Sequence, residues 1–214
     1  MENGPFRIPL FPLNVVMFPG MTLPLHIFEE RYRLMIGRCI EEKTAFGVVY
    51  GTDEGFAEVG CATVVAALLE RFPDGRMNIL TKGDRRLRVI EHFTEASRLT
   101  LPDSLPLIVG LAEAFEDEAE EVPSGVFQGV LRLYGEALRL VSGWTSLQAI
   151  QGLTPEALSF VVAAQLGLAP EDKQAILEMR SVSARLERLL HVLDRSLPGI
   201  REMKRRTGGN GHFG

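Results

Sequence analysis

Up to about residue 120, hydrophobic residues recur in short segments separated by turn signals, a pattern typical of β-strands. The predicted strands are residues 45–50, 59–70, 77–81, 86–92 and 107–115. Residues 72–76, Phe-Pro-Asp-Gly-Arg, lie between two of these strands and supply the proline and the Asp-Gly pair of a hairpin turn. The first half of the chain therefore predicts a β-rich lobe.

The stretch from residue 8 to residue 36, IPLFPLNVVMFPGMTLPLHIFEERYRLMI, places four prolines in a mostly apolar segment. They are Pro9, Pro12, Pro19 and Pro24. Proline donates no backbone N–H and biases its predecessor away from helix, so the four should not share one continuous element. We expect short strands broken by fixed bends, with Pro19-Gly20 as a turn between residues 15–17 and 22–25. The prolines are interpreted mainly as scaffold.

One helix is embedded among these strands. The apolar residues that recur at helical spacing are Phe28, Tyr32, Met35, Ile36, Cys39 and Ile40. Glu29 and Glu30 occupy the first turn, where carboxylates complement the positive end of the helix dipole. We expect this helix to pack its apolar stripe on the sheet and to expose Arg31, Arg38 and Glu42 to water.

Beyond residue 120 the hydrophobic period changes to that of helices. The predicted helices are residues 126–140, 155–168, 170–179 and a fourth that begins near residue 182 and is ended or kinked at Pro198-Gly199. Thr154, Pro155 and Glu156 supply a cap, a proline at the first helical position and an acid in the first turn. The second half therefore predicts a helical bundle.

An acidic run separates the two patterns. Residues 113–121 contain six Asp or Glu residues, and their mutual repulsion favours an exposed connection. The predicted fold is α+β, with a β-rich lobe containing one embedded helix at residues 1–119 and a helical bundle at residues 120–207. Residues 208–214 are predicted to be a disordered tail.

Composition and charge narrow the function classes. The 214 residues carry a formal net charge of −5, with 12 Lys/Arg against 20 Asp/Glu up to residue 121 and 11 against 8 beyond it. This balance does not indicate a nucleic-acid-binding protein. The apolar runs fall far short of the roughly 18 residues that cross a bilayer, and the first residues make a poor secretory signal. We therefore expect a cytoplasmic protein with no membrane span.

The sequence shows no motif of a catalytic, cofactor-binding or metal-binding site. GRCIEEKT, residues 37–44, resembles a phosphate-binding loop, but Glu42 replaces its second glycine and would repel phosphate. The glycines of residues 209–214 follow no predicted strand, as a dinucleotide-binding motif would require. Cys39 and Cys61 have no partners at the spacing of metal ligands or of a disulfide framework. We predict no catalytic residue, cofactor or metal, although a site assembled only in the folded chain leaves no such motif.

Three stretches in a fixed order resemble the N-terminal, substrate-binding domain of Lon proteases. They are IPLFPLNVVMFPGMTLPLHIFEERY, FPDGRMNILTKGDRRLRVI and PEDKQAILEMRSVSARLERLL. The resemblance covers residues 8–197 and implies a β-rich, barrel-like lobe joined to a small helical bundle, which holds unfolded or tagged polypeptide rather than cutting it. Lon proteases continue into an ATPase and a serine–lysine peptidase, so this chain resembles a stand-alone, non-catalytic form of the domain.

The candidate polypeptide-binding residues lie beside turns. They are Met17, Phe18, Met21, Phe56 and Phe72. Thioethers and aromatic rings on exposed tips suit an undemanding binder of apolar peptides, and the alternative is that these side chains point inward as core. The expected partners are unfolded or apolar polypeptide segments, or a protease or chaperone component. The acidic charge of the first lobe would mildly favour basic segments.

A small-molecule-binding or enzymatic domain on the same fold is the alternative function, because a fold does not determine a function. A closed cavity with convergent polar groups would favour that alternative. An open apolar groove or patch would favour the polypeptide-binding module.

Overall fold

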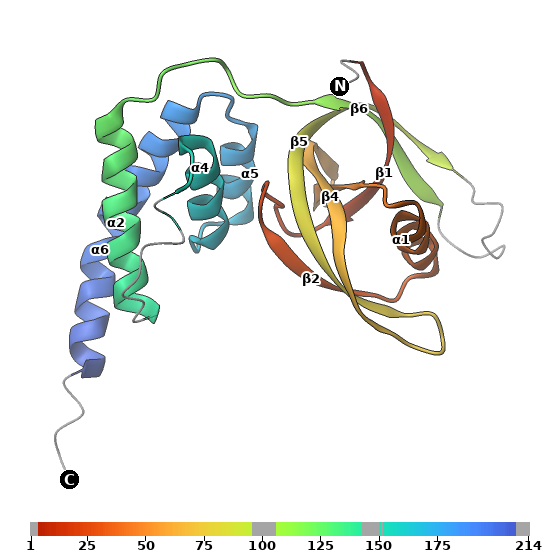
Figure 1. The fold of residues 1–214 in the computed structure, drawn as a ribbon, viewed down its shortest axis with the longest axis horizontal. Helices are drawn as coiled ribbons and strands as arrows, with labels where there is room; N and C mark the ends of the chain where they lie inside the picture. Colours follow the sequence, from red (N-terminus) through yellow and green to blue (C-terminus); the bar gives the residue numbers. More distant parts are fainter. Residues whose placement is uncertain (1–3, 96–105, 143–149, 151, 209–214) are drawn as a thin grey trace, which may run out of the picture. The chain divides into compact units, whose positions relative to one another are not determined.

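The computed structural model describes residues 4–95, 106–142, 150 and 152–208, and Figure 1 shows its strands and helices. The strands are β1 Phe6–Leu13, β2 Thr22–Ile27, β3 Phe46–Thr52, β4 Gly55–Arg71, β5 Met77–Glu95 and β6 Leu107–Ala114. The helices are α1 Glu30–Glu42, α2 Ser124–Ser142, α4 Pro155–Gln165, α5 Pro170–Glu178 and α6 Val182–Gly208. This mixed content confirms the α+β class. Of the predicted disordered tail, residues 209–214 lie outside the described residues.

The chain folds into two compact units, each made of two segments. Unit 1 comprises Met1–Glu116 and Gly167–Glu178, and unit 2 comprises Asp117–Leu166 and Met179–Gly214. Unit 1 holds the six strands with α1 and α5, and unit 2 holds α2, α4 and α6. The predicted ranges, 1–119 and 120–207, do not include this return of the chain to unit 1 at α5.

The strands pair in the order β2-β5-β4-β3-β1-β6, and β5 also pairs with β6, so that five strands form a closed ring of neighbours. The two halves of β5 have different partners, because Met77–Lys82 pairs with β2 and Leu87–Glu95 pairs with β6. The prediction of two separate strands within β5 is wrong. The register between β4 and β5 shifts so that Asp84 of β5 has no opposite residue, and the stretch between the two predicted strands is therefore a bulge inside one strand.

β1 contains Pro9 and Pro12, whereas Pro19 lies in a turn and Pro24 in β2, so the four prolines do not share one continuous element, as predicted. Residues 6–10 of β1 pair with β6 and residues 10–13 pair with β3, so near each proline the strand has a partner on one side only. The two prolines are three residues apart, so their nitrogens face opposite edges and each faces the unpaired side. Residues 15–17, predicted as a strand, form none.

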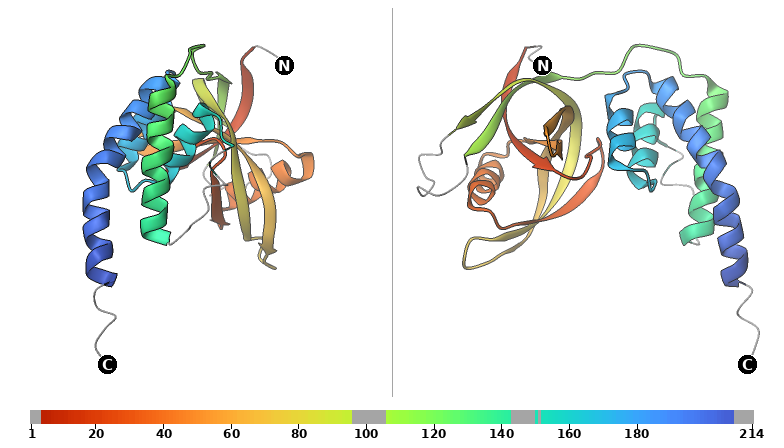
Figure 2. Two further views of the ribbon diagram at one scale, coloured as in Figure 1. Left: turned by 60° about the vertical axis from the view of Figure 1, so that its left-hand side comes forward. Right: turned by 180° about the vertical axis from the view of Figure 1, so that it is seen from behind.

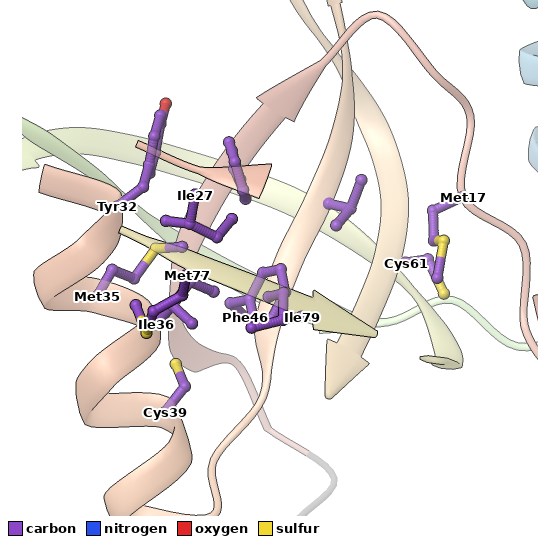
Figure 3. Close-up of a cluster of buried hydrophobic side chains, with 12 residues drawn as sticks. Met17, Ile27, Tyr32, Met35, Ile36, Cys39, Phe46, Cys61, Met77 and Ile79 are labelled. Atoms are coloured by element: carbon purple, nitrogen blue, oxygen red, sulfur yellow. The ribbon is translucent and has the colours of Figure 1, made fainter. Parts of the chain in front are cut away.

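α1 packs one face against the strands of unit 1. The buried residues of this face are Tyr32, Met35, Ile36 and Cys39. They belong to the same core cluster as Ile27 and Met77, and Figure 3 shows Met35 and Ile36 beside these strand residues. The predicted apolar stripe is confirmed with one correction: the helix begins at Glu30, so Phe28 precedes it and is exposed.

α5 contacts the strands of unit 1 through two polar side chains. Nε2 of Gln174 donates a hydrogen bond to the Val59 carbonyl at 2.9 Å. Nη1 of the buried Arg86 donates to the Leu177 carbonyl at 2.8 Å. Leu177 lies in the last turn of α5, where helix carbonyls have no partner within the helix. Arg86 therefore supplies a bond that the helix end needs.

α2 and α6 lie side by side in unit 2, and Figures 1 and 2 show that they run in the same direction. The contacts agree with this, because they advance along both helices together. Gly129 of α2 faces Leu190 of α6, and further along Glu136 accepts a hydrogen bond from Nε of Arg201 at 2.7 Å.

The helix ends of unit 2 follow the sequence signals in part. The Thr154 side chain accepts from the Ala157 N–H at 3.2 Å, which confirms the predicted cap of α4. α6 continues through Pro198 to Gly208, so the proline does not end the helix. Pro198 is exposed, and the Asp194 carbonyl that loses its N–H donor there can bond to water.

Within the described residues, no helix combines the length and apolarity that crossing a bilayer requires.

Residues 115–123 carry no helix or strand, but carboxylates of the acidic run have structural roles. Asp117 forms a bidentate ion pair with Arg185, which is 0% exposed, and its Oδ2 lies 2.8 Å from Nη2. Nε of Arg185 also donates to Oγ of Ser159 at 3.0 Å. Glu120 accepts from the Ser183 N–H at 3.0 Å, at the N-terminus of α6. The acidic run is therefore bonded to unit 2 at two points.

Candidate polypeptide-binding surface

The β4–β5 hairpin ends in the turn that the sequence predicts at residues 72–76. The Phe72 N–H donates to the Arg76 carbonyl at 2.9 Å, and the Gly75 N–H donates to the Phe72 carbonyl at 3.0 Å. Gly75 has a φ of 86°, a conformation that glycine adopts without strain. Asp74 accepts from the Arg76 N–H at 3.1 Å and from its guanidinium at 2.7 Å, and these bonds lower the pKa of Asp74. The turn is thus fixed by its own residues.

Exposed apolar side chains gather beside this hairpin. Phe28 is 61% exposed and Leu69 is 60% exposed. The His26 ring lies 6.1 Å from the Phe28 ring and 6.0 Å from the Phe72 ring, measured between centroids. Leu69 borders an open groove of about 570 Å³ that is also lined by Pro24, Leu25 and His26. We call the following residues the hairpin surface: Pro24, Leu25, His26, Phe28, Leu69 and Phe72.

Leu69 lies at a bulge, because β4 has an extra residue at this point. Leu68 pairs with Ile79 and Glu70 pairs with Asn78, so Leu69 has no opposite residue in β5. Such a bulge interrupts the alternation of inward and outward side chains along a strand. Leu69 falls at this interruption and is turned toward solvent.

A chain of hydrogen bonds borders the groove. Nδ2 of Asn78 donates to Oε2 of Glu70 at 3.0 Å, so Oδ1 of Asn78 is the atom that faces Nδ1 of His26, 2.7 Å away. An amide oxygen only accepts, and Nδ1 of His26 therefore carries the proton in this pair. The bond holds the imidazole in one orientation between Phe28 and Phe72.

The structure places Met17 and Phe18 in the core, which corrects the prediction that they form an exposed tip. Met17 is 1% exposed and Phe18 is 0% exposed, and Met17 shares a core cluster with Cys61 (Figure 3). The Pro19-Gly20 turn does form, with a φ of 77° at Gly20. Its closing hydrogen bond runs from the Met21 N–H to the Phe18 carbonyl at 3.1 Å.

This turn docks on Gly83 of β5, so that Met17 and Phe18 just before it are buried while Gly20 itself stays exposed. The Gly20 N–H donates to the Gly83 carbonyl, and the Gly83 N–H donates to the Met21 carbonyl, both at 2.9 Å. A Cβ at position 83 would lie 2.2 Å from the Phe18 carbonyl oxygen, so only glycine permits this approach. Met21 is partly buried against the same core cluster as Met17. The alternative interpretation, that these side chains point inward and belong to the core, therefore holds for Met17 and Phe18, and in part for Met21.

Phe56 and Phe72 lie at opposite ends of β4 and do not form one contact site. Phe56 is partly buried, and its ring packs edge-on against the His92 ring with centroids 4.9 Å apart. Phe72 directly follows the last residue of β4 and contributes to the hairpin surface. Of the five predicted residues, Phe72 is the one that the structure places there.

Sequence reasoning missed Phe28 and Leu69. Helical spacing assigns Phe28 to the buried face of the following helix, but α1 begins at Glu30 with Glu29 at its N-cap. The acidic pair after Phe28 is the signal that could have placed the helix start correctly. Leu69 ends a run of apolar residues that predicts a buried strand, and a bulge leaves no mark in such a run.

The two thiols offer no reactive group. Burial raises the pKa of Cys61 to about 12 and also raises the pKa of Cys39 above its usual value. Both side chains therefore stay protonated near neutral pH, whereas a nucleophilic cysteine acts as the thiolate. Among the residues that the structure describes, no three His, Cys, Asp or Glu side chains are grouped so as to hold a metal ion.

Two solved structures share the fold of this chain. The Lon N-terminal domain protein from Xanthomonas campestris matches with a TM-score of 0.67 at 24% identity, covering 87% of this chain and 98% of that one. The N-terminal domain of the Mycobacterium avium complex Lon protease matches with a TM-score of 0.70 at 19% identity, covering 88% of this chain and 98% of that one. At these identities the likeness establishes the fold alone.

Two Lon proteases are similar in sequence. That of Roseiflexus castenholzii is 30% identical over 210 residues, which are 89% of this chain and 24% of that protein. That of Escherichia coli is 28% identical over 214 residues, 93% of this chain and 26% of that protein. The chain thus spans about a quarter of the length of these proteases. The family model of the ATP-dependent protease La (LON) substrate-binding domain matches residues 7–195. The chain therefore belongs to the Lon substrate-binding domain family, as the order of its sequence motifs predicts.

Proposed function

We propose that this chain binds unfolded or apolar polypeptide segments through the hairpin surface and catalyses no reaction itself. The observation that carries the proposal is the gathering of Phe28, Leu69 and Phe72 around His26, with Phe28 and Leu69 largely exposed. Clustered apolar side chains at the surface are typical of interaction sites. Membership of a substrate-binding domain family supports the proposal, because the substrate of a protease is a polypeptide.

The shape of the groove favours polypeptide over the small-molecule alternative. Small-molecule sites enclose most of the ligand and converge several polar groups on it. The groove beside Leu69 is open, and its polar side chains, His26, Asn78 and Glu70, are bonded to one another. An extended polypeptide can lay one large apolar side chain against Leu69 and Leu25 without being enclosed.

The contacts are made by side chains rather than by the addition of a strand. β2 pairs only with β5 among the described strands, and a free edge of this kind invites pairing with another chain. Pro24 lies in the middle of β2, opposite Leu80, and the ladder with β5 continues on both sides of it. Its nitrogen therefore faces the free edge, where the missing N–H discourages strand addition.

The affinity is expected to be weak and tolerant of sequence. An unfolded segment loses conformational entropy when it is ordered on a surface, and this loss opposes the gain from apolar contact. Dissociation constants around micromolar, equivalent to about −8 kcal/mol, are expected.

Serine substitutions separate the hairpin surface from general surface hydrophobicity. Leu69 is 60% exposed and Ile90 is 52% exposed, and both lie in strands, but only Leu69 borders the groove. We expect Phe28→Ser/Leu69→Ser to weaken binding of a fluorescent, permanently unfolded model protein about tenfold, and Ile90→Ser to change it by less than about twofold.

The melting temperatures of these variants control for unfolding. Substitutions at exposed positions usually change stability little, so the variants and the parent should melt alike. Equal weakening by Phe28→Ser/Leu69→Ser and by Ile90→Ser would refute the assignment of the surface. No binding by the parent chain at about 100 micromolar would refute the proposed function and favour the small-molecule alternative.

A further inference from the structure

A second groove, of about 380 Å³, lies beside α1 in unit 1. Its lining includes Arg31, Arg33, Leu34 and Arg38 from α1 and Arg71 from the end of β4. We call these five residues the α1 groove. Leu34 is 38% exposed, so an accessible apolar side chain lies among four arginines.

The basic end of the α1 groove adjoins the hairpin surface. Arg71 directly precedes Phe72 in the chain. The guanidinium of Arg33 donates a hydrogen bond to the Asp74 carbonyl in the hairpin turn. A polypeptide with a side chain against Phe72 would therefore place its neighbouring residues next to Arg71 and Arg33.

Four arginines against two acids line this groove, although residues 1–121 carry 12 Lys/Arg against 20 Asp/Glu. The two acids, Glu41 and Glu42, lie in the last turn of α1, away from the hairpin. Exposed charges act over about 8 Å at physiological ionic strength, so a ligand responds to the local arrangement more than to the net charge.

Several guanidinium groups of the α1 groove retain free donors. Arg31 is paired with Glu29 at 2.9 Å, whereas Arg38 and Arg71 have no carboxylate partner among the described residues. Arg33 bonds to a carbonyl through Nη1, and its Nε is buried without an acceptor. Guanidinium presents its donors in a planar fork that matches the two oxygens of a carboxylate.

We propose that the α1 groove binds carboxylates of the client polypeptide, so that the chain prefers segments in which acidic residues flank an apolar one. This inference rests on the proposed function and names the client class of the same surface. The apolar side chain contacts the hairpin surface, while a neighbouring Asp or Glu reaches Arg33, Arg38 or Arg71. The preference is opposite to the one for basic segments that the net charge of the first lobe predicts.

Three fluorescent peptides test the preference. They share one apolar core and differ only in whether glutamate, lysine or serine residues flank it. At an ionic strength of about 0.05 M, the glutamate peptide should bind about threefold to tenfold more tightly than the serine peptide, and the lysine peptide more weakly. In about 1 M salt, where the Debye length is about 3 Å, the three should agree within about twofold.

Two double variants locate the effect. Arg38→Gln/Arg71→Gln removes two charges from the α1 groove, and Lys82→Gln/Arg85→Gln removes two exposed charges elsewhere on unit 1. We expect the first variant to lose its preference for the glutamate peptide and to bind the serine peptide as the parent does. The second variant should keep the preference. Thermal melts followed by circular dichroism should agree among the three proteins.

The serine peptide distinguishes failure of this inference from failure of the proposed function. A parent chain that binds it, but binds the glutamate and lysine peptides equally, would overturn the acidic preference and leave the proposed function intact. A parent chain that binds none of the peptides would overturn both. Equal loss of preference in the two double variants would assign the effect to net charge and overturn the role of the α1 groove.

Discussion

Replacing Gly83 by alanine is expected to destabilise unit 1, because the new methyl group would meet the backbone of the Pro19-Gly20 turn. The added Cβ would lie 2.2 Å from the Phe18 carbonyl oxygen and 3.0 Å from Sγ of Cys61. The obstacle at 2.2 Å is backbone rather than the end of a flexible side chain, so the turn itself must move away from β5.

The magnitude follows from what this movement breaks. The turn is held to β5 by the two hydrogen bonds between Gly83 and its residues Gly20 and Met21, both at 2.9 Å. Each bond contributes about 0.5–1.5 kcal/mol, and forcing an extra methyl group into a packed region costs about 1–3 kcal/mol. We expect Gly83→Ala to lower the free energy of unfolding by about 2–6 kcal/mol.

Urea unfolding with hydrogen exchange read by mass spectrometry is the assay, because it separates peptides of residues 15–27 and 77–90 from those of unit 2. Gly37→Ala is the control: Gly37 lies inside α1, its added Cβ would meet nothing within 4 Å, and the change should stabilise the helix by about 0.5–1 kcal/mol. Unchanged protection of residues 15–27 in Gly83→Ala would refute the docking of this turn.

Two further predictions concern unit 2. Arg185→Met should lower the free energy of unfolding, measured by thermal melts, by about 3–5 kcal/mol, because it leaves Asp117 without its buried partner. Arg185→Met/Asp117→Leu should recover part of that loss. An equal or larger loss in the double variant would contradict this reasoning. The Ser183 N–H lowers the pKa of Glu120 from its usual 4.5 in the folded chain. The stabilising contribution of the ionised Glu120 carboxylate is therefore present above pH 4.5 and is lost as the pH falls through the lowered pKa of the folded chain. Urea midpoints between about pH 5 and pH 3 should fall more steeply for the parent than for Glu120→Gln, whereas the exposed neighbour Glu121→Gln should behave as the parent does.

Features set by neighbouring residues could be predicted from the sequence. The hairpin turn at residues 72–76 depends on its own proline, aspartate and glycine, and the start of α4 depends on Thr154 and the residues just after it. The buried stripe of α1 follows from helical spacing alone. The order of such local signals also sufficed to indicate the family.

Features that depend on distant contacts could not be predicted. A proline-glycine turn flanked by Met17 and Phe18 has the same sequence whether its tip is free or docked, and here Gly83 of a later strand decides the outcome. The bulge at Leu69 depends on the register between β4 and β5, which no local pattern encodes. Of the candidate surface, the sequence therefore predicted Phe72, and the other residues could be identified only from the folded structure.

The return of the chain to unit 1 at α5 has a consequence for how the protein is made. A ribosome adds about 5–20 residues per second, so about 3–12 seconds pass between synthesis of Glu116 and of Glu178. Throughout this interval the nascent strands exist without the helix that bonds to the Val59 carbonyl and to Arg86. The newly made β-rich part is itself an incompletely folded polypeptide for these seconds. A messenger truncated after the last strand would leave its product in that state permanently, exposed to the chaperones and proteases that clear such chains.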